Sequence, residues 1–404
     1  MRSSATLHDA PPLQSVLEDP YPLLEMYRAH GEICFSPIEK GWIVTSHAAV
    51  IDVLRATSDF SNHSNGVERI LQGADGAAHL NTRRAMNSGF SKPILERIEP
   101  ILREVARDCI LSARARGSVE SIAHLAQPMP TRVFSELTGA TPVAGERLLQ
   151  WGGSISAHAR LISPSRRPSV SARRMLTRAV RRVSDPTYLE FLEAKDFIAA
   201  LLHGEVPGGD GTPMIKSLRG LVEEGSAEWD DVIGVGLEFV FASTETTMGL
   251  IGYMVKRLSE DHELMRRLKS REVSHETFVE EVLRFDSPVM KLNRRVKRTV
   301  ALRGAELAAG DRILAVIAAA NRDPLVFARA EEFDPTRAPN KHLAFGAGPH
   351  ACPGAQLARL EARIFLDEFL ELVNEVRLDP SRNSVTYRGL GVTRSIAEMH
   401  VVLS

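Results

Sequence analysis

The segment that decides the fold is FGAGPHACPG at residues 345–354, and a helical pattern follows it directly. Its single cysteine, Cys352, comes after a loop with spaced glycines and before the expected helix. Glycine lets the backbone pass close to the sulfur in conformations that other residues avoid, and Pro353 suits a first helical turn. The positive end of the helix dipole favours a thiolate there. The segment therefore predicts a thiolate that holds a metal from one side, with a buried cysteine in a glycine turn as the alternative.

The whole pattern around Cys352 resembles the haem-binding loop of the cytochrome P-450 family, Phe-Gly-x-Gly-x-His/Arg-x-Cys-x-Gly. Phe345, Gly346 and His350 all match this very specific motif. The resemblance implies that Cys352 is the axial iron ligand of haem b, whose thiolate favours O–O cleavage. It also implies the family's fold, which is mainly α with small peripheral β-sheets, and O2 as co-substrate without a bound flavin. The resemblance covers roughly Asp19 to the C-terminus.

The composition is that of a globular protein with a large core. The chain has 404 residues, 44% hydrophobic and 25% charged, and a formal net charge of -1, which gives no indication of nucleic-acid binding. Its three cysteines are too few and too scattered for a disulfide framework. There is no apolar signal-peptide core, and no apolar run approaches the about 20 residues that span a membrane. We therefore expect a cytoplasmic protein without a membrane partner, with a loose arm at 1–18 and, as the resemblance implies, one domain at 19–404.

Helical patterns dominate from residue 79 to about residue 283 and return after Cys352. Short strand-like stretches are expected at 42–46, 300–302, 312–316, 385–387 and 400–403. The sequence thus predicts a mainly helical protein with small sheets.

A polar segment, ASTETT at residues 242–247, follows an apolar helical run. Carboxylates and hydroxyls in an apolar helix are costly unless they are paired or useful, so alone the segment indicates a helix end with capping threonines. In a sequence that also contains the cysteine loop, the segment resembles the oxygen-binding groove of the family, Ala/Gly-Gly-x-Asp/Glu-Thr, in which Ala242 takes part. The resemblance implies that Glu245 and Thr246 relay protons to dioxygen. Ser243 stands where glycine is usual, which bears on the groove's shape and not on the reaction class.

The haem propionates need cationic or hydrogen-bonding partners. His79 and Arg83 lie one helical turn apart and resemble the family's His-x-x-x-Arg, although alone they would indicate a surface pair. Arginine binds carboxylates bidentately, and Arg294, which is next to Arg295, stands where another propionate arginine is expected. His350 is the fourth candidate.

Glu281 and Arg284 lie three residues apart on one face of an expected helix, where they can pair. Such pairs are common on solvated helices. Upstream of Cys352 and followed by Ser-Pro-Val, this one resembles the family's Glu-x-x-Arg pair. The resemblance implies that the pair, with Arg337 as its third member, stabilises the core behind the haem.

Two features bear on the substrate. Seven arginines lie between residues 166 and 182, a region that covers the substrate entrance in the family. They would suit an acidic or carrier-bound substrate, while a solvated helical face is the more ordinary interpretation. The candidates for the substrate pocket are Leu237, Val240, Phe241, Met290 and Val392.

The resemblance predicts a haem-thiolate monooxygenase of the bacterial type that acts on a small organic molecule, as in secondary metabolism. Electrons would come from NAD(P)H through ferredoxin and ferredoxin reductase. We expect the ferredoxin on the thiolate side, where Arg84, Lys341 and Arg359 are cationic. A peroxide-dependent relative and a non-catalytic haem carrier or sensor are the alternatives, and the Glu245–Thr246 pair counts against both.

Overall fold

The structure is a computed structural model that describes residues 11, 16–62, 73–140, 143, 145–158, 185–207, 211–382, 384–389 and 392–404. Most of the expected arm at 1–18 and the arginine-rich stretch at 166–182 lie outside the described residues. The chain divides into two units, one formed by Met1–Ser61, Glu99–Met129 and Thr246–Ser404 and the other by Asn62–Ile98 and Pro130–Glu245. A single domain at 19–404 stays a prediction.

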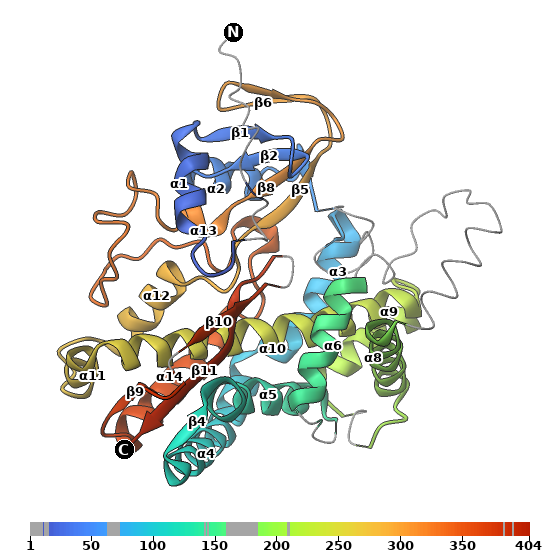
Figure 1. Ribbon diagram of the computed structural model, residues 1–404. Coiled ribbons are helices and arrows are strands. Elements are labelled where there is room, and N and C mark those ends of the chain that lie inside the picture. Colours follow the sequence, from blue (N-terminus) through green and yellow to red (C-terminus); the bar gives the residue numbers. More distant parts are fainter. Residues whose placement is uncertain are drawn as a thin grey trace. The chain divides into compact units, whose positions relative to one another are not determined.

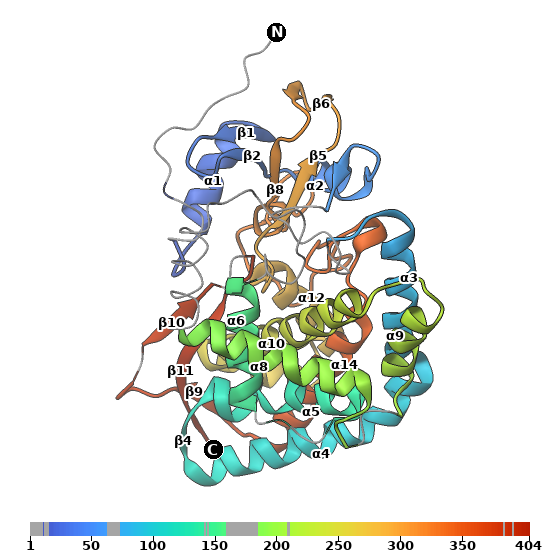
Figure 2. The same cartoon turned by 90° about the vertical axis from the view of Figure 1, so that its right-hand side faces the viewer.

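Most elements belong to the first unit, and Figures 1 and 2 label many of them. Its helices are α1 (Tyr21–Ala29), α2 (His47–Arg55), α11 (His262–Lys269), α12 (His275–Phe285), α13 (Ile317–Ala320), α14 (Ala355–Leu372), a π-helix (Ile122–Ala126) and the 3-10 turn η5 (Gly348–His350). Its strands are β1 (Ile33–Ser36), β2 (Gly41–Val44), β3 (Phe60–Ser61), β4 (Ser118–Glu120), β5 (Leu292–Val296), β6 (Val300–Leu302), β7 (Ala305–Leu307), β8 (Arg312–Ala315), β9 (Val376–Leu378), β10 (Val385–Arg388) and β11 (Ser395–Leu403).

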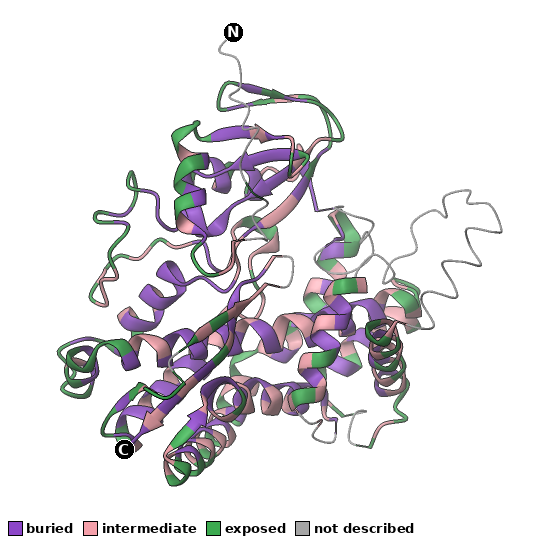
Figure 3. Cartoon of the chain, viewed as in Figure 1, coloured by how far each residue is buried: buried purple, intermediate pink, exposed green. Residues whose placement is uncertain are grey.

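A five-stranded sheet in the order β1-β2-β8-β5-β3 organises the N-terminal part of this unit. Only β2 and β8 run parallel. Because side chains alternate along a strand, Trp42 and Ile313 pack in the core that α2 covers, whereas Ile43 and Leu314 pack in the core with α1. Apart from the start of β8, both strands are purple in Figure 3, as expected for a sheet covered on both faces.

The remaining strands form two smaller sheets. In one, β11 pairs with β10, β4 and β9, and the other is the hairpin of β6 and β7. The second unit holds α3 (Gly76–Asn87), the 3-10 turn η2 (Ser88–Phe90), α6 (Gly145–His158), α8 (Pro186–His203) and α9 (Pro213–Glu223). Helices α4 (Lys92–Arg116), α5 (Pro128–Thr138) and α10 (Trp229–Glu260) continue from one unit into the other.

The predicted fold class, mainly α with small sheets, is confirmed. All five predicted strand stretches are strands, with 300–302 matched at both ends and 400–403 forming the end of the longer β11. Strands such as β1, β5 and β9 were not anticipated. No helix of the described residues combines the length and the apolar character that crossing a membrane requires.

Candidate active site

Cys352 lies between η5 and α14, at the end of a tightly closed loop. Its backbone N–H donates to the carbonyl oxygen of Phe345 at 2.8 Å. Gly346 and Gly348 have φ values of +68° and +74°, in the left-handed region that favours glycine. The cysteine itself is exposed, so the alternative of a buried structural cysteine is wrong. An exposed cysteine on a fixed loop suits a metal ligand.

Gly348 is also required by close packing. A Cβ added there would lie 2.8 Å from the carbonyl oxygen of Leu54 and 3.1 Å from the Cα of Arg55. These residues end α2, whose other face lies in the core of the five-stranded sheet. The position of the cysteine loop is therefore set by the sheet through α2.

The other two cysteines do not offer a thiolate. Cys34 is fully buried in the core beneath the sheet, and burial raises the pKa of its thiol to about 11. Burial also raises the pKa of Cys109 to about 12, and its Sγ lies 3.2 Å from the carbonyl oxygen of Ala106. Cys352 is thus the cysteine whose surroundings suit axial ligation of a haem.

The register of β5 separates the two adjacent arginines. Arg294 is paired with Ile313 of β8 and its side chain is buried, at 6% exposed. Arg295 is exposed and donates to the carbonyl oxygen of Gly310 at 2.7 Å. The buried face therefore belongs to Arg294, which supports the choice of this residue as the propionate partner. His350 is half-buried at the end of η5 in the same unit.

His79 and Arg83 lie on α3, in the second unit. His79 is buried, and burial together with the neighbouring guanidinium of Arg83 lowers the pKa of its imidazole. A neutral imidazole can still donate one hydrogen bond to an anion. Arg83 is half-buried. A solvated surface pair therefore does not describe these residues.

Helix α10 carries the acid–threonine pair in its interior. It runs unbroken from Trp229 to Glu260, so the alternative of a helix end with capping threonines is wrong. Glu245 is buried and Thr246 is half-buried. Ser243 donates its hydroxyl to the carbonyl oxygen of Phe239 at 2.7 Å, a bond to the preceding turn that slightly bends helices. The hydroxyl of the serine at the usual glycine position is therefore hydrogen-bonded to the backbone of its own helix.

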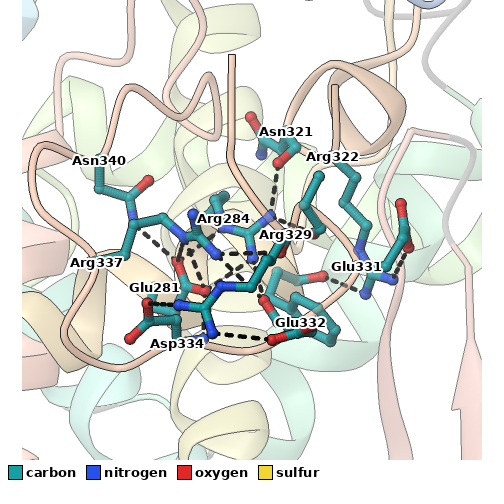
Figure 4. A network of polar contacts seen from close by, with 12 residues as sticks. Glu281, Arg284, Asn321, Arg322, Arg329, Glu331, Glu332, Asp334, Arg337 and Asn340 are labelled. Carbon is teal, nitrogen blue, oxygen red and sulfur yellow. Dashed lines mark hydrogen bonds and ion pairs between the residues drawn. The ribbon is translucent and has the colours of Figure 1, made fainter. Parts of the chain in front are cut away.

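The Glu281–Arg284 pair is completely buried, at 0% exposed for both side chains (Figure 4). Arg284 donates from Nε and Nη2 to the two carboxylate oxygens at 2.8 Å each. Arg337 donates from Nε to the same carboxylate at 3.2 and 3.3 Å. The predicted trio thus lies together, and the alternative of a solvated helix pair is wrong.

The sequence-based prediction missed the other partners in this network. The carboxylate of Glu281 also accepts from the Asn340 side chain at 3.0 Å and from the Asp334 backbone at 2.8 Å. The remaining N–H groups of Arg284 bind the carbonyl oxygens of Asn321, Ala330 and Glu332 at 2.8–2.9 Å. Asn321 and Asp334 lie in the sequence segments Asn-Arg-Asp-Pro at 321–324 and Phe-Asp-Pro at 333–335.

The predicted pocket residues fall in different units. Leu237, Val240 and Phe241 belong to the second unit, and the first two are fully buried. Met290 and Val392 belong to the first unit, where the Met290 N–H donates to the Val392 carbonyl oxygen at 2.9 Å. The structure therefore brings together the last two. The common pocket stays a prediction.

The chain is similar to known proteins in both sequence and structure. The family model described as Cytochrome P450 matches residues 275–382, which contain the buried pair and the cysteine loop. The chain is 28% identical over 383 residues to "Putative cytochrome P450 YjiB" of Bacillus subtilis, covering 91% of each protein. It is 26% identical to "Steroid C26-monooxygenase" of Mycobacterium tuberculosis, covering 89% of this chain and 94% of the relative.

Solved structures give the same result. The crystal structure of CYP109B1 from Bacillus subtilis is 26% identical, with a TM-score of 0.77, and the match covers 95% of this chain and 99% of that one. CYP109E1 from Bacillus megaterium in complex with testosterone is 25% identical, with a TM-score of 0.82 and coverage of 95% and 97%. The fold and the comparisons therefore define a haem-thiolate protein. The chain belongs to the cytochrome P450 family. It is a monooxygenase of that family.

Proposed function

We propose that this protein inserts one atom of dioxygen into a small organic substrate, with haem b held by Cys352. The observation that carries the proposal is the exposed cysteine on a loop whose backbone is fixed by Gly348 against α2. When bound, the haem supplies the oxygen activation, in which one oxygen atom enters the substrate and the other leaves as water. Phe345 and Gly346 form the turn that closes behind the cysteine.

Four side chains would hold the propionates. Arg294 offers a buried guanidinium, which desolvates little further when it binds a carboxylate and can do so bidentately. His350, His79 and Arg83 complete the set, with His79 acting as a neutral donor because burial and Arg83 lower its pKa. Ala242 of α10 would lie against the haem.

Glu245 and Thr246 would move protons to the oxygen site. A buried carboxylate next to a hydroxyl on one helix is a suitable relay, because each can donate in one state and accept in another. The Ser243 hydroxyl donates to the carbonyl oxygen of Phe239 within the same helix.

Electrons would reach the haem from ferredoxin and ferredoxin reductase. Lys341 and Arg84 are exposed and available for an acidic partner, whereas Arg359 is paired with Glu280. The substrate would be a small organic molecule of secondary metabolism, held among Leu237, Val240, Phe241, Met290 and Val392. Names of relatives include a steroid monooxygenase and a complex with testosterone, so steroids are sensible first probes.

The test is spectroscopic and then catalytic. The reduced protein with carbon monoxide should show the strongly red-shifted Soret band of a thiolate-bound haem, and Cys352→His should lose it while Cys109→Ala keeps it. A band that Cys352→His leaves unaltered would refute the ligation.

Turnover separates the proposed reaction from its alternatives. With a surrogate ferredoxin and reductase, a substrate found by its effect on the haem spectrum should consume labelled dioxygen and gain one labelled oxygen atom. Product formed only with added peroxide would indicate a peroxygenase. Substrate binding without a product in either arm would indicate a carrier or sensor.

A further inference from the structure

Glu280 of α12 has no part in the function proposed above. Its carboxylate binds two side chains of the cysteine segment, which we define as residues 342–359. Arg359 of α14 donates from Nε at 2.6 Å and from Nη2 at 2.8 Å, one bond to each carboxylate oxygen. His342 lies with its Nε2 at 3.0 Å from Glu280 Oε2. The geometry is that of a bidentate arginine–carboxylate pair with a third hydrogen bond, and such charged bonds are stronger than neutral ones.

The two partners lie on opposite sides of Cys352 in the chain. His342 precedes the glycine loop, and Arg359 is in the first turns of the helix that follows it. Between them, the bond from Cys352 N–H to the Phe345 carbonyl oxygen closes the loop. The carboxylate of Glu280 therefore binds the chain on both sides of Cys352. We call these contacts of Glu280 with His342 and Arg359 the clamp, and the stretches that carry His342 and Arg359 the two arms of the cysteine loop.

Each arm is oriented further by its own contacts. The Nδ1 of His342 lies 3.2 Å from the backbone N–H of Ala344, so Nδ1 accepts and the imidazole carries its proton on Nε2, towards Glu280. The guanidinium of Arg359 lies 4.5 Å from the ring centre of Phe345, in a cation–π contact. His342 and Arg359 make these contacts in the same positions in which they bind Glu280.

The three side chains of the clamp are partly shielded from water, and Glu280 stays ionised among them. The side chain of His342 is 3% exposed, that of Glu280 25% and that of Arg359 34%. Burial would raise the pKa of Glu280, but hydrogen bonds from Arg359 and His342 outweigh it and lower this pKa to about 2. Glu280 is therefore ionised over the working pH range, and its loss would leave the Arg359 charge uncompensated.

The neighbouring Glu281 has a different task. Its carboxylate binds Arg284, Arg337 and Asn340, which lie outside the segment from His342 to Arg359. Consecutive helical residues point in different directions. Glu281 thus stabilises the core, and Glu280 contacts the cysteine segment directly.

We propose that Glu280 is a positioning residue that clamps both arms of the cysteine loop and so fixes the Cys352 sulfur as the haem ligand. This inference rests on the proposed ligation by Cys352. It also assigns Arg359 to the clamp, so that its charge is balanced within the protein.

The test compares Glu280→Gln with Glu276→Gln in the holoenzyme. Glu276 is an exposed carboxylate on the same helix that accepts a hydrogen bond from the Ser274 hydroxyl, so it is a matched control. The readout is the rate at which the reduced carbon monoxide complex loses its thiolate-type Soret band under mild warming. We expect loss about tenfold faster for Glu280→Gln, because a partly buried charge loses its partner, and no change for Glu276→Gln.

A second readout excludes a merely structural effect. Removing the Glu280 charge leaves the Arg359 cation uncompensated near the haem site, and this favours the reduced, more negative iron. The midpoint potential of Glu280→Gln should therefore shift upward relative to wild type, while that of Glu276→Gln should not. Equal potentials and equal Soret loss rates in the two variants would overturn the clamp.

A double-mutant cycle tests the pair itself, and its Arg359→Lys arm remains informative even where Glu280→Gln fails to fold. Lysine keeps the charge and loses the bidentate geometry. If the residues act as one clamp, Arg359→Lys should also speed Soret loss, and the double variant should be no worse than the more severe single variant. Additive effects, or a silent Arg359→Lys, would contradict the proposal. A wild-type protein without the thiolate band would instead refute the ligation by Cys352, so the two failures are distinguishable.

Discussion

Gly348 lies so close to the end of α2 that an added Cβ would fall 2.8 Å from the carbonyl oxygen of Leu54. Its φ of +74° already disfavours other residues. The glycine is therefore required by space as well as by conformation, and the cysteine loop depends on both.

Gly348→Ala should accordingly impair haem incorporation. Left-handed strain costs about 1 kcal/mol or more, and the clash with α2 backbone adds to it because neither segment can yield cheaply. Gly304→Ala is the control, since Gly304 also has a positive φ of +82° but nothing within 4 Å of its added Cβ. Haem content and thermal unfolding should fall more for Gly348→Ala than for the control. Equal losses would show that close packing plays no part.

Arg294 and Arg295 provide a pair of adjacent substitutions with opposite expectations. Arg294→Ala should weaken haem retention by about 2–5 kcal/mol, because a buried guanidinium would be removed from a poorly solvated carboxylate. Arg295→Ala should have little effect, because its side chain is exposed and bonds the Gly310 carbonyl oxygen. Haem transfer to an excess of an apo-acceptor protein measures both. Similar transfer rates would contradict the proposed role of Arg294.

Glu281→Gln should destabilise the fold strongly. Arg284 is 0% exposed, and without a balancing carboxylate its buried charge would cost about 3–5 kcal/mol. Glu263→Gln is a suitable control because Glu263 forms an exposed pair with Arg266, and exposed pairs contribute little to stability. Urea unfolding of both variants measures the difference. A loss of stability no larger than the control's would mean that the network relaxes around the substitution.

Local sequence patterns predicted the parts of this molecule in which neighbours along the chain act together. Cys352 and its glycines, the pair of Glu281 and Arg284, and the long central helix are of this kind. The hydrogen bonds from Asn340 and Asp334 to Glu281 could not be predicted from the sequence, because these residues come together only after the chain has folded. For the same reason Glu280 gave no signal, since its partners Arg359 and His342 are far away in sequence.

Short strands were harder to predict from the sequence than helices. Strand β5 contains Asn293, Arg294 and Arg295, and its polar residues hide the strand pattern. The sheet imposes this structure by pairing β5 with the apolar strand β8. Choosing between Arg294 and Arg295 needed that pairing, because it decides which side chain is buried.

Thr246→Ala should keep haem and substrate binding but divert reducing equivalents to peroxide or water. The reason is that a positioned hydroxyl assists the protonation that precedes O–O cleavage, an effect of about 10²–10⁴-fold in general acid–base catalysis. Ser243→Ala is the control, since the Ser243 hydroxyl is bound to the Phe239 carbonyl oxygen. The ratio of product to NAD(P)H consumed measures coupling. If Ser243→Ala uncouples and Thr246→Ala does not, the relay uses the serine.

Docking of the ferredoxin should depend on Lys341 and Arg84 rather than on Arg359. Both are exposed, whereas the charge of Arg359 is balanced by Glu280. Reversal at Arg359 would disturb the clamp, so it cannot report on docking alone. Lys341→Glu should slow reduction of the ferric protein by ferredoxin at low salt and leave substrate binding unchanged, because association with an acidic partner is steered by charge.

The measurement is stopped-flow reduction across a salt series, with Lys269→Glu as a control at an exposed lysine of α11, outside the cysteine segment. Wild-type and control rates should fall as salt rises, since screening weakens the attraction between the partners. The Lys341→Glu rate should start lower and depend less on salt. If Lys269→Glu slows reduction as much as Lys341→Glu, the effect reflects net charge. If the reduction rate depends neither on salt nor on the charge reversal at Lys341, this lysine is not part of the docking surface.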